Sequence, residues 1–244
     1  MPQIFRVGGC VRDEILEVKS KDIDFTFILD DLNQTVESGF QSMTDWMQTE
    51  GFTVFLSTPS CFTIRAKFPK TSVHSNLTAD FVMARKEVGY ISGTRTPILE
   101  LGTLADDLIR RDFTLNAMAQ AEDGTIIDLF GGREDLAAGI LRTPVDAMTT
   151  MMDDPLRILR ALRFSITKGF TIHEDIWKAM RQRDILEKLA LVVSQERIRD
   201  EVFKMFKFDT VGTMMLFGEV EQSIPDFIRL VFSKGLWLCP TFKL

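Results

Sequence analysis

The sequence predicts an α+β fold, in which a mixed strand-and-helix part is followed by an all-helical part. Short strand-like runs alternate with helical patterns up to about residue 145, whereas the pattern after DGTIIDLFGGREDL is helical to the end. The chain has 244 residues, of which 45% are hydrophobic, so it can bury a substantial core. We therefore place a domain boundary near residue 145.

The first part begins with a strand at QIFRVGG, followed by a helix from Val11 to about Lys19. DIDFTFIL predicts a second strand, and residues 36 to 50 predict a second helix. Further strands are expected at FTVFLS, CFTIRAKF and TADFVMAR, which are rich in β-branched and aromatic residues. The segments PKTSVHSN and VGYISGTRTP are predicted to be loops. A helix is expected to begin near Leu104 and to continue through LIRRDFTLNAMA.

In the second part, no strand pair is expected, and one helix has an unusual polar side. DDPLRILRALRF predicts a helix from Pro155, because proline suits a first helical turn and the leucines form an apolar stripe. Arginines three residues apart, at 157, 160 and 163, form a ladder with Asp154 along one side of this helix. Taken alone, the pattern is typical of a solvated face with one ion pair.

Charge is distributed unevenly along the chain, whose net charge is −6. Residues 1–150 hold 14 basic and 22 acidic side chains, whereas residues 151–208 hold 12 and 9. No apolar run is long enough to cross a bilayer and no leader precedes the first strand, so we expect a cytoplasmic protein without a membrane partner. Cys10, Cys61 and Cys239 lack the spacing of a metal site and are interpreted as small side chains of the core.

Two carboxylates stand close together in KDIDFTF. Asp22 and Asp24 are two residues apart on a predicted strand, so both leave the same face. Such a pair repels itself unless a cation lies between, and magnesium prefers oxygen ligands of this kind. Asp80, on TADFVMAR, is a candidate third ligand. The alternative for all three acids is a solvent-facing structural role.

A glycine pair joins the first strand to the first helix. In VGGCVRD, Gly8 and Gly9 leave backbone amides open at a helix start, with Arg12 one turn further on. This pattern favours a phosphate-binding turn, although such a glycine pair often only permits the backbone to turn from strand to helix. Together with the carboxylates, it predicts a site for a nucleoside triphosphate and its magnesium.

Six segments then resemble, in order, the motifs of one family. They are VGGCVRD with DIDFTF, RRDFTLNAMA, DLFGGREDL, DDPLRILRALRF and SQERIRDEVFKM, and they cover residues 4 to 208. The sequence is similar to the bacterial-type (class II) CCA-adding tRNA nucleotidyltransferases and their poly(A) polymerase relatives, of the polymerase beta superfamily. The resemblance implies a polymerase-beta-like head over residues 1–145, a base-selecting helical neck over 146–208, and a short helical remnant of the body over 209–244. A form without most of the body and tail is thus expected.

The resemblance also assigns residues of the head. Asp22 and Asp24 would be catalytic and would hold magnesium, with two ions expected. The residues implied to contact the nucleotide are Gly8, Gly9, Arg12 and Arg111, with Asp112 and Asn116 one helical turn apart nearby.

In the neck, Asp154 and Arg157 would imitate a base edge and select the incoming base. Asp154 can accept from the amino group of cytosine or adenine, while Arg157 donates to the adjacent ring nitrogen. Arg160 and Arg163 would reach the triphosphate and the RNA backbone. Asp153 stands where the family has glutamate, and Glu196 and Arg197 are expected to support the neck without touching substrate.

The implied activity is addition of CMP and AMP, from CTP and ATP, to the 3′ end of tRNA. Alternatives are a poly(A) polymerase, a partial CC- or A-adding enzyme, and a non-catalytic RNA-binding remnant. VGYISGTRTP resembles the segment that relatives use in switching to A, which favours full CCA addition. A homodimer is a further expectation, because little of the tRNA-gripping body is expected.

Overall fold

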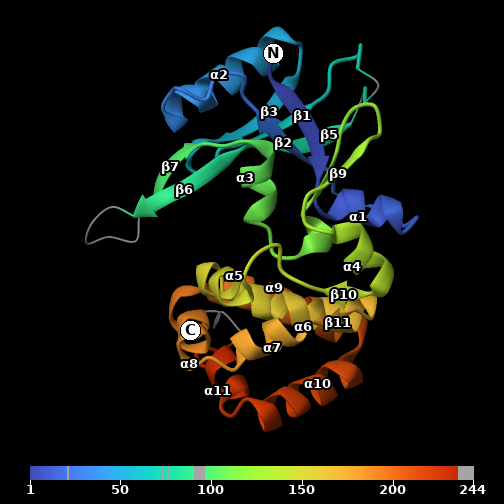
Figure 1. Ribbon diagram of the computed structural model, residues 1–244, viewed down its shortest axis with the longest axis vertical. Coiled ribbons are helices and arrows are strands. Elements are labelled where there is room, and N and C mark those ends of the chain that lie inside the picture. Colours follow the sequence, from blue (N-terminus) through green and yellow to red (C-terminus); the bar gives the residue numbers. More distant parts are fainter. Residues whose placement is uncertain (21, 73, 76, 91–96, 236–244) are drawn as a thin grey trace, which may run out of the picture. The chain divides into compact units, whose positions relative to one another are not determined.

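The computed structural model describes residues 1–20, 22–72, 74–75, 77–90 and 97–235 (Figure 1). Two compact units divide the chain, Met1–Arg133 and Glu134–Leu244. The predicted fold class is confirmed, because the first unit combines a mixed sheet with helices and the second is mainly helical. The borders at residues 145 and 208 stay predictions. Of the three cysteines expected in the core, Cys10 is buried, Cys61 is exposed and so was wrongly placed, and Cys239 lies outside the described residues.

A seven-stranded sheet forms the centre of the first unit, in the order β3-β4-β5-β2-β1-β8-β9. β2 and β5 run parallel, and the other neighbouring strands run antiparallel. A separate hairpin joins β6 and β7. The bounds are β1 Gln3–Val7, β2 Asp24–Ile28, β3 Thr53–Thr58, β4 Thr63–Lys67, β5 Thr78–Met83, β6 Arg85–Tyr90, β7 Pro97–Leu101, β8 Met118–Gln120 and β9 Ile126–Asp128.

The largest core of this unit lies between the sheet and α2 (Val36–Thr49). α2 begins at the cap Thr35, whose side chain accepts from the Ser38 amide, and it buries Phe40, Met43 and Met47 at helical spacing. Successive side chains of a strand leave opposite faces. Phe25 and Phe27 of β2 therefore join this core, which leaves Asp24 and Thr26 for the other face.

Three predictions in the first unit are wrong in their bounds. α1 spans Gly9–Ile15 and stops well before Lys19, because Glu17 adopts a left-handed φ of 57°. The predicted loop VGYISGTRTP contains the end of β6 and the start of β7, while residues 91–96 lie outside the described residues. The helix that begins at Leu104, α3, ends at Ile109.

α3 is followed by a 3₁₀ turn, η2 (Thr114–Asn116), and then by β8. The helical prediction failed here because β8 pairs with both β1 and β9, and sheet pairing outweighs local propensity. A second 3₁₀ turn, η1, spans Pro59–Cys61.

The second unit packs its helices around a core of aliphatic side chains and phenylalanines, with α6 against α9 as a principal pair. It also contains a short parallel pair, β10 (Ile140–Leu141) with β11 (Thr171–Ile172), so the expectation of no strand pair is wrong. Two residues per strand are too few to show a period-2 pattern in the sequence. α4, Gly132–Ala138, begins two residues before the border of the units. The later helices are α5 Ala147–Asp153, α6 Leu156–Lys168, α7 Glu174–Met180, α8 Arg183–Val192, α9 Gln195–Phe208, α10 Thr210–Ser223 and α11 Phe227–Val231. Among the described residues, no helix has the length and apolar character needed to cross a membrane.

Candidate functional site

Carboxylates gather where two parallel strands of the sheet lie side by side. Asp24 opens β2, and its partner in register on β5 is Asp80. Asp24 is exposed by surface area, yet enough protein surrounds its carboxylate to affect its pKa. The pKa of Asp24 is raised, chiefly because burial disfavours the charged form. The Arg111 guanidinium opposes this shift, and the negative charges of Asp80 and Asp22 add to it. The three carboxylates therefore repel one another electrostatically, and a cation between them would reduce this repulsion.

Asp22 and Asp80 differ from Asp24 in their surroundings. Asp22 precedes β2 instead of lying on it, so the strand starts two residues later than predicted. Asp80 accepts two hydrogen bonds from Arg65 of β4, at 2.8 and 2.9 Å, and this fork already balances its charge. Within the part of the chain that the structure describes, no three metal-ligating side chains form a ready cluster. Asp22, Asp24 and Asp80 as magnesium ligands therefore all stay predictions.

The turn between β1 and α1 brings Gly8 next to Arg111. Gly8 has a φ of 77°, and its amide donates to the Met118 carbonyl at 3.2 Å. The backbone angle favours glycine, and a Cβ at Gly8 would come within 2.6 Å of Arg111 Nη1, so that the guanidinium would have to shift. Gly9 follows as the first residue of α1.

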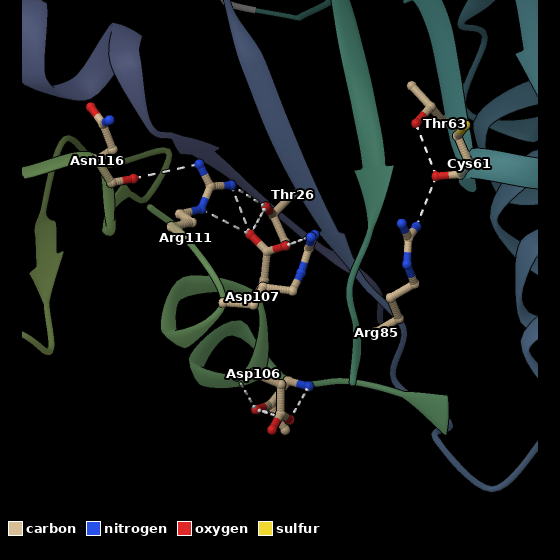
Figure 2. Close-up of polar contacts among 10 residues, drawn as sticks. Thr26, Cys61, Thr63, Arg85, Asp106, Asp107, Arg111 and Asn116 are labelled. Atoms are coloured by element: carbon tan, nitrogen blue, oxygen red, sulfur yellow. Dashed lines mark hydrogen bonds and ion pairs between the residues drawn. The ribbon is translucent and has the colours of Figure 1, made fainter. Parts of the chain in front are cut away.

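Arg111 is held by a buried acid that our reading of the sequence missed. Asp107 of α3 is fully buried and bonds Arg111 Nη2 at 2.8 Å, Arg110 Nη2 at 2.5 Å and the Thr26 hydroxyl at 2.7 Å (Figure 2). Desolvation acts to raise the pKa of Asp107, but the charges of Arg111 and Arg110 outweigh it and hold the pKa at about 2. The signal was present in ADDLIRR, where Asp107 and Arg111 are four residues apart on a helix.

A second buried group links α1 to the segment after α3. Arg12 donates from Nη1 to Asn116 Oδ1 at 2.6 Å, and Asn116 donates from Nδ2 to Asp112 Oδ1 at 2.9 Å. All three side chains are buried. Asp112 and Asn116 meet across η2, and the expectation of a regular helical turn between them is wrong, because Phe113 is extended. The predicted head residues Gly8, Gly9, Arg12, Arg111, Asp112 and Asn116 therefore lie in one connected region.

In the second unit, Asp154 occupies the break between α5 and α6. Its Oδ1 accepts from the Leu156 amide at 3.3 Å. Its carboxylate also accepts from Arg197 of α9, at 2.7 Å from Nη2 to Oδ2 and at 3.4 Å from Nη1 to Oδ1. Arg157, the second residue of α6, donates from Nη1 to the Thr150 carbonyl at 3.0 Å.

The remaining arginines of the ladder face α9. Glu201 is buried, contacts Arg163 Nε directly, and lies 3.8 Å from Arg160 Nη1. α9 therefore supplies an arginine opposite Asp154 of the α5–α6 junction and a glutamate opposite Arg160 and Arg163 of α6. From the sequence, Arg197 was expected only to support the neck, and Glu201 was not identified. They are separated from their partners by 43 and 38 residues, so no local pattern reveals the pairing.

A mixed sheet that carries paired carboxylates at the start of its central strand, followed by a helical extension, defines a polymerase-beta-like nucleotidyltransferase head. Residues 4–142 match the family model of the Poly A polymerase head domain, and the chain belongs to this family.

Relatives and solved structures extend the match into the second unit. The Multifunctional CCA protein of Neisseria gonorrhoeae is 40% identical over 184 residues, which cover 74% of this chain and 38% of that protein. The protein of the same name from Actinobacillus pleuropneumoniae is 33% identical over 239 residues, covering 93% of this chain and 52% of that protein. The crystal structure of the Bacillus stearothermophilus CCA-adding enzyme in complex with CTP is 27% identical with a TM-score of 0.67, and the match covers 96% of this chain and 49% of that one.

A tRNA nucleotidyltransferase complexed with a primer tRNA and an incoming ATP analogue gives a TM-score of 0.68 at 27% identity, over 97% of this chain and 61% of that chain. This chain thus spans between about two-fifths and three-fifths of the length of these proteins.

Proposed function

We propose that this chain carries the nucleotidyl-transfer and base-selecting parts of an enzyme that adds CMP and AMP, from CTP and ATP, to the 3′ end of tRNA. The observation that supports this most directly is the 33% identity to a Multifunctional CCA protein over 239 residues, because that match covers both the carboxylates and the α5–α6 junction. Poly(A) synthesis and partial addition are the alternatives that the assay below separates.

The reaction is an in-line displacement at phosphorus. The 3′-hydroxyl oxygen of the RNA loses its proton to solvent and forms a bond to the α-phosphorus, the bond from that phosphorus to the bridging oxygen breaks, and pyrophosphate leaves with the electron pair. Asp22 and Asp24 would hold two magnesium ions, and Asp80 is the candidate for a third carboxylate ligand. When bound, such ions lower the pKa of the attacking hydroxyl and offset the charge that develops on the leaving oxygens.

Arg12 and Arg111 would bind the phosphates and sugar beside the turn at Gly8 and Gly9. Each guanidinium is anchored by a buried partner, Asn116 for Arg12 and Asp107 for Arg111. Anchoring reduces the conformational freedom that binding must remove, so the two cations are preorganised for a polyphosphate. Asp112 would act through Asn116, with which it shares a hydrogen bond.

Base choice would come from the α5–α6 junction. Asp154 would accept from the exocyclic amino group of cytosine or adenine, and Arg157 would donate to the adjacent ring nitrogen. Uracil and guanine place a carbonyl oxygen against the Asp154 carboxylate, and two facing acceptors left unpaired cost about 1 to 3 kcal/mol each when buried. The requirement that this junction and the carboxylates of the first unit serve one nucleotide is part of the proposal.

Arg160 and Arg163 would contact the triphosphate and the RNA backbone. Because both face Glu201, such contact requires either sharing of the guanidinium donors or exchange of one carboxylate contact for a phosphate oxygen. Arginine can share donors in this way, because its guanidinium carries five N–H groups.

The proposed partners are the tRNA 3′ end and the two nucleotides, and we propose no interaction with a membrane. A cytoplasmic location and a homodimer are included in the proposal.

The test is extension of a tRNA that lacks its terminal CCA, with CTP, ATP or both, read as product length. Full CCA addition predicts two added residues with CTP alone and three with both nucleotides. A long ladder with ATP alone would instead indicate a poly(A) polymerase, and a product that stops after CC or gains only A would indicate a partial enzyme. Absence of extension under all conditions would overturn the proposal and leave RNA binding without catalysis.

A further inference from the structure

The first unit has a cavity on the face of its sheet that is opposite the carboxylates. The cavity has a volume of about 520 Å³, within the range of roughly 300 to 1,000 Å³ that is usual for small-molecule sites. Arg6 of β1 is in register with Phe25 of β2 and with Gln120 of β8, and opposed residues of antiparallel strands share a face. All three residues line the cavity. Phe25 belongs to the core beneath α2, whereas its neighbour Asp24 leaves the other face, so the cavity is separate from the carboxylates.

Aromatic rings form one wall of this cavity. The ring centroid of Phe68 lies 5.1 Å from each of those of Phe25, Phe52 and His74. Trp46 of α2 extends the wall beyond Phe52, with 6.0 Å between the two ring centroids. Trp46, Phe52 and His74 are only half-buried, so ring surface remains for a bound molecule. A flat aromatic ligand suits such a wall, because aromatic rings attract one another when offset-stacked or edge to face.

The cavity also has an arginine that uses only part of its donors. Arg6 donates from Nη1 to Gln120 Oε1 at 2.6 Å and to Glu14 Oε2 at 2.5 Å. Among the described residues, Arg6 Nε is buried without a hydrogen-bond partner, and Nη2 makes no hydrogen bond. Nε and Nη2 form one edge of the planar guanidinium. This unpaired edge matches a planar ligand that carries two adjacent acceptors.

The charges at the cavity favour an uncharged ligand over an anion. Glu14 already balances Arg6 in an ion pair. Glu50 and Glu122 line the cavity as well, and both are exposed. Their carboxylates repel a phosphate or a carboxylate, whereas they attract the N–H groups of a neutral heterocycle.

We propose that this cavity binds an uncharged purine base or nucleoside, for which guanine is the best-matched base. Guanine carries two adjacent acceptors, O6 and N7, to which an arginine donates as a pair. Its amino group is a donor for the carboxylate of Glu50 or Glu122, and its rings lie against the aromatic wall. Because Arg6 Nε is covered in the unliganded chain, the guanidinium turns toward the ligand as it binds. This site goes beyond the proposed nucleotidyl transfer and does not depend on it.

The experiment is equilibrium dialysis of the full chain without magnesium, with guanosine, adenosine, GMP or indole as the probe, and with guanosine also in the presence of excess CTP. Ile4→Trp is the filling variant, because Ile4 lines the cavity, is half-buried and shares the face of Arg6 two residues away. Ile98→Trp is its matched control, on the exposed part of β7 and away from the cavity lining. Arg6→Met removes the guanidinium and keeps an unbranched side chain. Thermal unfolding checks that each variant is folded.

Wild type should bind one equivalent of guanosine, adenosine and GMP should each bind at least about threefold more weakly, and CTP should not displace guanosine. Ile4→Trp should weaken guanosine binding at least about tenfold, and Ile98→Trp should leave it unchanged. Arg6→Met should also weaken guanosine binding about tenfold, the scale of a lost hydrogen bond to a charged group. Its affinity for indole, which has no acceptor, should stay within about twofold of wild type, which also shows that the cavity is intact.

Four results would overturn the proposal. They are no binding of guanosine to wild type, equal affinity for guanosine and adenosine, displacement of guanosine by CTP, and equal losses in Ile4→Trp and Ile98→Trp. Displacement by CTP would assign guanosine to the nucleotide site of the proposed function. None of the four decides the proposed function, which the tRNA extension assay tests separately.

Discussion

Replacement of Asp107 by asparagine should destabilise the first unit in a pH-dependent manner. Asp107 is fully buried, and its pKa is held at about 2, against an ordinary value of 3.8, chiefly by Arg111 and Arg110. A difference of roughly two pKa units corresponds to about 2.5 kcal/mol of stabilisation from the ionised form. Asparagine keeps the shape but removes this charge, so the free energy of unfolding at pH 7 should fall by about 2 to 4 kcal/mol.

The sign of the pH dependence follows from the depressed pKa. The contribution of Asp107 is fully present above the pKa of the unfolded state, near 4, and is lost as the pH falls through the folded value of about 2. The difference in stability between wild type and Asp107→Asn should therefore be constant from pH 7 to pH 5 and should shrink between pH 4 and pH 2.

Urea unfolding followed by Trp46 fluorescence measures this difference, in a background where Trp177 and Trp237 are phenylalanine. Trp46 packs against the core of the first unit, so its signal reports on that unit. Asp45→Asn is the control, because Asp45 is exposed and its carboxylate accepts a hydrogen bond from Gln41 at 2.8 Å. The reasoning is wrong if Asp107→Asn costs no more than Asp45→Asn, or if its cost is the same at pH 3 as at pH 7.

Three other predictions concern the carboxylates, the glycine turn and the base-selecting pair. Asp24→Asn should reduce nucleotide transfer by at least a thousandfold without lowering the melting temperature, because removal of a partly desolvated charge relieves repulsion from Asp22 and Asp80; retained transfer would contradict the assignment. Gly8→Ala should lower the free energy of unfolding by about 1 to 3 kcal/mol through backbone strain and contact with Arg111, whereas Gly218→Ala, whose new Cβ meets no atom within 4 Å, should be neutral or stabilising in thermal unfolding. Arg157→Ala should increase misincorporation of UMP and GMP about tenfold in single-nucleotide extension, and an unchanged preference would argue against its role.

Much of the first unit could be predicted, because its strands and α2 have clear local periods. Val36, Phe40, Met43 and Met47 follow a helical spacing, and the observed α2 ends within one residue of the prediction. β8 could not be predicted, since its three residues follow a buried segment whose apolar content is equally compatible with a helix. Its strand conformation depends on β1, more than a hundred residues earlier in the chain.

The candidate site was predictable as a set of residue types more than as a set of contacts. The two-residue spacing identified Asp24 and the family resemblance identified Arg111, and the structure brings them close enough for the charge of Arg111 to affect the pKa of Asp24. Arg197 and Glu201 illustrate the limit, because their importance lies in partners on another helix. Helical periodicity shows which side of α6 is polar, but only packing shows which helix balances that side.

The central claim is that Asp22 and Asp24 act on the same nucleotide that Asp154 and Arg157 select. A crystal structure of the chain with CTP and magnesium tests it most directly. The account predicts that the cytosine amino group lies within hydrogen-bonding distance of the Asp154 carboxylate while the α-phosphate lies beside Asp22 and Asp24. A cytosine bound away from the α5–α6 junction, with the triphosphate still at the carboxylates, would contradict it.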